Sequence, residues 1–156
     1  MTDTESLKIG QGSGVETRGP RRILRSVGAV FTGLVAVFML SLGTDVVLHA
    51  TGIYPPWFKP MSTPLWLFAT SYRIVFGVLG GYIVARLAPG RPMAHALVLG
   101  VVGLALSIAG AAGTWNAGPE FGPRWYPLAL VFTAIPSAWA GGKIRVSQLR
   151  ARGLSI

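Results

Sequence analysis

The chain has 156 residues, of which 51% are hydrophobic and only 12% are charged, whereas a soluble domain carries about 25% charged residues. With a mean hydropathy of +0.55, this composition excludes an ordinary soluble globular protein and predicts a membrane protein. The net charge is +9, but the basic residues stand at the edges of apolar blocks. This is typical of membrane topology signals and not of a nucleic-acid surface.

The polar N-terminal segment, residues 1–21, is expected to be a disordered cytoplasmic tail. Its glycine-rich run at residues 10–14 predicts a linker, because no strand precedes it as a phosphate-binding loop would require.

The first apolar block covers about residues 24–47, after Arg21, Arg22 and Arg25. It is long enough to cross the ~30 Å hydrocarbon core at ~1.5 Å per residue. The connection at residues 51–64 contains four prolines, which a continuous helix cannot accommodate. The block therefore predicts one membrane span that ends before this connection.

Three further spans are predicted at about residues 65–87, 93–113 and 128–142. The short turn at 88–92 contains two prolines, so the second and third spans are expected to be antiparallel. The fourth span is the shortest, and Pro136 predicts a kink in it. Residues 22–143 are thus expected to form an all-α bundle of four transmembrane helices, arranged as two antiparallel hairpins. Residues 144–156 form a basic cytoplasmic tail.

The distribution of lysine and arginine predicts the orientation. Eleven of the fourteen lie in the two tails and the 88–92 turn region, two lie in the other loops (Lys59 and Arg124), and Arg73 lies within a span. The positive-inside rule then places both termini and the turn in the cytoplasm.

Small residues recur at helical spacing along the second and third spans. Close approach of such residues, not apolar burial, associates helices in lipid. We expect these stripes to face inward, although a homodimer contact remains an alternative. The candidate packing residues are Gly77, Gly81, Ala85, Gly100, Gly103 and Ser107.

Arg73 is a charge deep within the second span, where an unpaired arginine costs about 2.5–3.5 kcal/mol. Asp45, near the far end of the first span, is the best candidate partner. Counting ~1.5 Å per residue from the cytoplasmic edge separates the two backbones by ~10 Å in depth. A long arginine side chain covers most of that gap.

His49 shares a helical stripe with Asp45, so it is the candidate for extending a polar network outward from Asp45 and Arg73. Three interpretations remain open. The charges form a structural pair that fixes helix register, or they snorkel separately toward the interface. Alternatively, they form a functional polar site for an anionic ligand or for proton movement.

Catalytic motifs are missing from the sequence, including His-Glu-x-x-His, Gly-x-Ser-x-Gly and the P-loop. The two histidines lie at opposite faces of the predicted bundle, and the chain has no cysteine, so no metal site or cofactor is expected. We therefore expect a protein that is not an enzyme.

Three stretches carry a resemblance to a known group: Leu42–His49, Arg86–Gly100 and Trp125–Gly142. In them the chain resembles small uncharacterised bacterial integral membrane proteins with four spans, over about residues 22–145. The resemblance implies the same fold and a location in the bacterial cytoplasmic (inner) membrane, and it implies no activity. Small multidrug exporters are not a match, because their first span carries a glutamate and no span here does. The translocator-protein family has five spans.

The expected function is a structural, accessory or interaction role in the membrane. The alternative is a carrier of a small solute or ion that acts as a homo-oligomer through a site around Asp45 and Arg73. The expected partners are the lipid bilayer, with anionic lipid at the basic cytoplasmic tails, and no nucleic acid.

Overall fold

The computed structural model describes residues 19–153, which form four α-helices, one 3-10 turn and no strand. The bounds are α1 Pro20–Ala50, α2 Thr63–Leu87, α3 Pro92–Thr114, η1 Pro119–Phe121 and α4 Trp125–Ala151. The prediction of an all-α fold is confirmed for these residues. Nearly all of the predicted tail at 1–21 lies outside the described residues, and α1 begins within its last two positions.

Prolines set the helix boundaries. A proline occupies the first turn of α1, α2 and α3, where its missing N–H has no intrahelical partner to lose. Helix α2 ends at Leu87, just before Pro89. Arg91 then adopts a left-handed conformation with φ of 46°. These features allow the chain to reverse direction within the four residues that separate α2 from α3.

Three helices are long and apolar enough to cross a membrane: α2, α3 and residues Arg21–Ala50 of α1. Helix α4 is not among these candidate spans. Its apolar run is short and is diluted by two prolines, two glycines and a serine. It also continues to Ala151, so much of the predicted basic tail is helical. Pro136 lies inside this helix.

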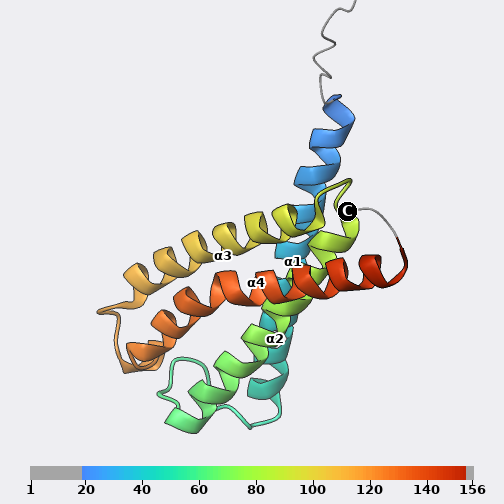
Figure 1. Ribbon diagram of the computed structural model, residues 1–156. Helices are drawn as coiled ribbons and strands as arrows, with labels where there is room; N and C mark the ends of the chain where they lie inside the picture. The colour runs from blue at the N-terminus through green and yellow to red at the C-terminus, as the bar shows by residue number, and fades with distance from the viewer. Residues whose placement is uncertain (1–18, 154–156) are drawn as a thin grey trace, which may run out of the picture.

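Helix α2 is the centre of the fold, since it packs against α1, α3 and α4. Figure 1 shows the α3–α4 pair crossing the α1–α2 pair obliquely. Helix α4 packs closely with α2 and α3 but has little contact with α1. The bundle therefore has a side on which α1 stands apart from α4. We call the end with the 51–62 and 115–124 connections the long-loop end, and the end with the 88–91 turn the short-turn end.

Glycines lie where the helices approach most closely. An added Cβ on Gly81 of α2 would lie 2.8 Å from Ala138 Cα, and one on Gly141 of α4 would lie 2.5 Å from Tyr82 N. Both neighbours are backbone atoms, which cannot move aside as a flexible side chain can. The crossing of α2 and α4 therefore depends on the absence of side chains at these two positions.

Candidate functional site: a polar cluster beside two adjoining cavities

The two charges predicted within the first two spans are in contact. Arg73 Nη2 of α2 lies 2.6 Å from Asp45 Oδ2 of α1. The Asp45 side chain is 17% exposed and the Arg73 side chain 22%, so both are largely removed from solvent. The ion pair joins α1 to α2 in the half of the bundle nearer the long-loop end.

Tyr72, which is not among the predicted site residues, completes the cluster. Its hydroxyl donates to Asp45 Oδ1 and accepts from Arg73 Nη1 at 2.9 Å. Arg73 Nη1 also lies 3.4 Å from the main-chain oxygen of Ala69. Both carboxylate oxygens and both terminal guanidinium nitrogens are thus hydrogen-bonded, as a partly buried ion pair requires.

His49 lies next to this cluster but does not bind the carboxylate. Its Nδ1 donates to the main-chain oxygen of Asp45 at 2.8 Å. Its ring stacks on Trp57, with centroids 3.7 Å apart, and meets the edge of Tyr54 at 5.3 Å. The imidazole therefore fixes the 51–62 connection against α1, and it does not extend the Asp45–Arg73 hydrogen bonds outward.

Aromatic rings surround the guanidinium. The Cζ atom of Arg73 lies 5.1 Å from the ring centre of Tyr72 and 5.8 Å from that of Tyr126, distances at which a cation is attracted to a ring face. Tyr126 in turn packs on Trp66 at 4.5 Å. In the 51–62 connection, burial raises the pKa of Tyr54 above its ordinary value.

A wide cavity of about 730 Å³ lies among the four helices and the 51–62 connection at the long-loop end. Its walls are mostly apolar and aromatic, and Asp45, Lys59, Arg73 and Glu120 add charge. Its volume falls within the range of about 300–1,000 Å³ typical of ligand sites.

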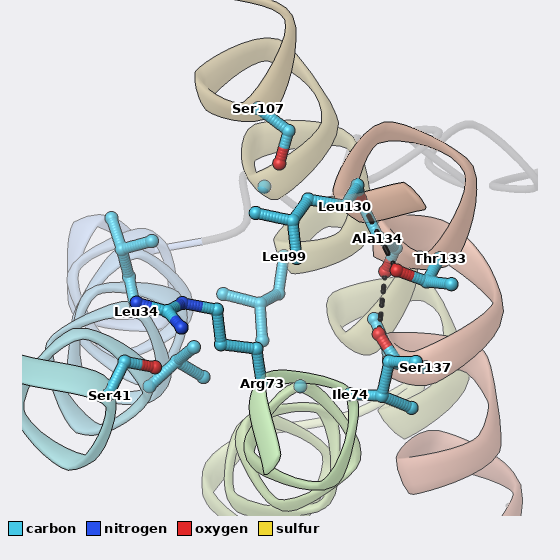
Figure 2. A pocket seen from close by; sticks show the side chains of 14 residues that line it. Leu34, Ser41, Arg73, Ile74, Leu99, Ser107, Leu130, Thr133, Ala134 and Ser137 are labelled. Atoms are coloured by element: carbon cyan, nitrogen blue, oxygen red, sulfur yellow. Dashed lines mark hydrogen bonds between the residues drawn. The ribbon is translucent and has the colours of Figure 1, made fainter. Parts of the chain in front are cut away.

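A second, narrower cavity of about 170 Å³ continues from it toward the short-turn end. The two share Arg73, Ser107 and Leu130 in their walls, so they adjoin. Figure 2 shows Arg73 reaching from α2 toward α1, with Ser107 of α3 pointing into the space opposite. The remaining hydroxyl groups are at Ser41, Thr133 and Ser137, and the last two already donate to carbonyl groups of α4.

The predicted packing residues have two different surroundings. Gly77, Gly81 and Gly100 face α4. An added Cβ would lie 2.6 Å from Ser137 Oγ, 2.8 Å from Ala138 Cα and 3.1 Å from Ala138 Cβ, respectively. Ala85 is 3% exposed. Gly103 and Ser107 instead line the narrow cavity, and an added Cβ on Gly103 would meet nothing within 4 Å. The small-residue stripe of α3 therefore packs at one end and lines open space at the other.

Sequence reasoning did not select Tyr72, although it lies next to an identified charge. Tyr72 adjoins Arg73 in the sequence. Tyr126 lies in the first turn of α4, directly after the 115–124 connection. A tyrosine beside an intramembrane charge is a usable signal, because its hydroxyl can satisfy a carboxylate without adding charge.

The site thus combines two cavities that could hold a ligand with an ion pair that joins two helices. Within residues 19–153 there is no group of three or more histidine, aspartate or glutamate side chains that could hold a metal ion. Comparisons of the chain with protein-family models, curated proteins and solved structures found no match.

Proposed function

We propose that the protein is a four-span, non-enzymatic membrane protein of the bacterial cytoplasmic membrane, with a structural, accessory or interaction role. The four-span topology is supported by the packing of α4 along α2 and α3, which are both candidate spans. Because α4 is covered by these neighbours, it needs less apolar surface toward lipid than α1 does. The distribution of basic residues supports cytoplasmic termini, where anionic lipid is the proposed partner of the basic segments.

The observation that carries the structural role is the pairing of the intramembrane charges. Arg73 is bonded to Asp45, Tyr72 and Ala69, all from α1 and α2. A charge that moves a proton or releases a ligand has to exchange its partners, whereas this arrangement holds two helices in register. The pair therefore acts as a lock between α1 and α2.

A specific observation favours a second candidate, a carrier of a small solute or ion that works as an oligomer. Arg73 forms part of the wall of both cavities, so a ligand in either one would meet it. A carrier requires water to reach this region from the long-loop side.

Water access distinguishes the two functions. Because the chain has no cysteine, Ser107→Cys introduces a single thiol in the wall shared by the cavities. Ser62→Cys, on the exposed connection, is the matched control. In intact membranes we expect a charged, impermeant maleimide to label the Ser62→Cys protein and to leave the Ser107→Cys protein unlabelled. Equal labelling of both would refute the proposed role and favour the carrier.

A further inference from the structure

The wide cavity opens sideways, at the level of the helix centres. Helices α1 and α3 approach near Gly33, where an added Cβ would lie 3.6 Å from Leu99 Cδ2. They diverge toward the long-loop end (Figure 1). There Phe38 of α1 and Leu106 of α3 line the cavity and are 61% and 56% exposed. Both residues lie in the middle of candidate spans, so the opening faces the hydrocarbon region of a bilayer.

An apolar chain fits the inner part of this space. The narrow cavity is lined mainly by leucine, isoleucine, valine and alanine side chains, with Arg73 where it adjoins the wide cavity, and two of its four hydroxyl groups already donate within α4. Water is stable in a cavity only with about two to four polar partners, and an empty space forfeits the dispersion contacts of its walls. An acyl chain entering from the side satisfies both conditions.

The outer part of the wide cavity differs in chemistry. Its charged side chains are two acids, Asp45 and Glu120, and two bases, Lys59 and Arg73, so the lining has no net formal charge. Trp57 also lines this part and is 53% exposed. His49 stacks on one face of its ring, and the other face can attract an ammonium group. A lining of this kind is complementary to a head group that carries one positive and one negative charge.

From this geometry we propose that the cavities bind one zwitterionic membrane lipid. One acyl chain lies in the narrow cavity, and the head group lies among Lys59, Glu120 and the aromatic side chains at the long-loop end. The inference goes beyond the proposed function, because a lock between α1 and α2 needs no ligand.

Three glycines of α3 allow a matched test. An added Cβ on Gly103, Gly110 or Gly113 would meet nothing within 4 Å. Gly103 lines the narrow cavity and Gly110 the wide one, whereas Gly113 lines neither. Leucine at Gly103 or Gly110 therefore occupies the lipid site, and Gly113→Leu is the control on the same helix.

The parent and the three variants are placed in bilayers of equal parts phosphatidylethanolamine and phosphatidylglycerol. Each is then extracted in mild detergent and weighed intact with its retained lipid by native mass spectrometry. We expect the parent and Gly113→Leu to retain one phosphatidylethanolamine. We expect Gly103→Leu and Gly110→Leu to retain about tenfold less, since the leucine overlaps the bound chain.

Equal retention by all four proteins, or none by the parent, would overturn the proposal. Preferential retention of phosphatidylglycerol would overturn the zwitterionic assignment. The thermal unfolding midpoint shows whether Gly103→Leu folds. If it does not, Gly110→Leu still tests the proposal, because Gly110 is exposed and tolerates a larger side chain. Retained lipid is a separate readout from the stability of the Asp45–Arg73 pair, so failure of this inference leaves the lock between α1 and α2 standing.

Discussion

The closest approach of α2 and α4 makes Gly141→Ala a demanding test of the fold. The added methyl group would lie 2.5 Å from Tyr82 N and closer still to the main-chain oxygen of Val78. Ordinary van der Waals contact begins at 3.4 Å, so the two backbones have to separate by about 1 Å. A gap of about 0.5–1 Å removes a quarter to a half of the dispersion energy of each contact. Because overpacking is itself destabilising, we expect the free energy of unfolding to fall by about 2–3 kcal/mol.

Thermal unfolding of the purified protein in detergent measures this effect. A loss of that size corresponds to a midpoint about 4–12 °C below the parent's, at about 2–4 °C per kcal/mol. The matched control is Gly113→Ala, where the methyl group meets nothing within 4 Å. The control is expected to gain up to about 1 kcal/mol from helix propensity. A Gly141→Ala protein as stable as its control would refute the α2–α4 packing described above.

Two further predictions concern the polar cluster and the topology. Tyr72→Phe removes a hydroxyl that bonds both Asp45 and Arg73. We expect the free energy of unfolding, measured by thermal unfolding, to fall by about 1.5–3 kcal/mol. A change below the error of the measurement would show that the hydroxyl contributes nothing. Single cysteines at Ser62 and Gly90 are expected to react with an impermeant maleimide from opposite sides of the membrane, so Gly90→Cys reacts only after permeabilisation. Labelling of both from the same side would contradict the four-span arrangement.

Much of the secondary structure could be predicted from the sequence, because the signals are local. Long apolar blocks separated by proline-rich connections predict helices, and prolines mark their starts. The boundary of α4 was harder to predict: its apolar run ends near Gly142, whereas the helix continues to Ala151, since lysine and arginine are good helix formers outside the membrane as well.

The Asp45–Arg73 contact could be approached by counting depth along two helices, because the reach of an arginine side chain tolerates an error of several ångströms. The oblique crossing of the helix pairs, and the cavities beside it, could not be predicted in this way. Helices α2 and α3 carry apolar side chains on all of their faces, so hydropathy does not specify which face turns inward. Gly100 and Gly103 belong to one predicted stripe, yet only the structure shows that one packs on α4 and the other lines open space.

The most direct test of the account is a charge-reversal cycle on Asp45 and Arg73, read by thermal unfolding of the purified protein. Removing one partner of a buried pair costs about 3–5 kcal/mol, and the partial exposure of these side chains places the expected loss at the lower end. Asp45→Arg and Arg73→Asp are each expected to be destabilised, and the double swap to recover much of the loss. Destabilised single variants without recovery in the double swap would contradict the lock between α1 and α2. Single variants as stable as the parent would contradict it as well and would show that Arg73 is already solvated.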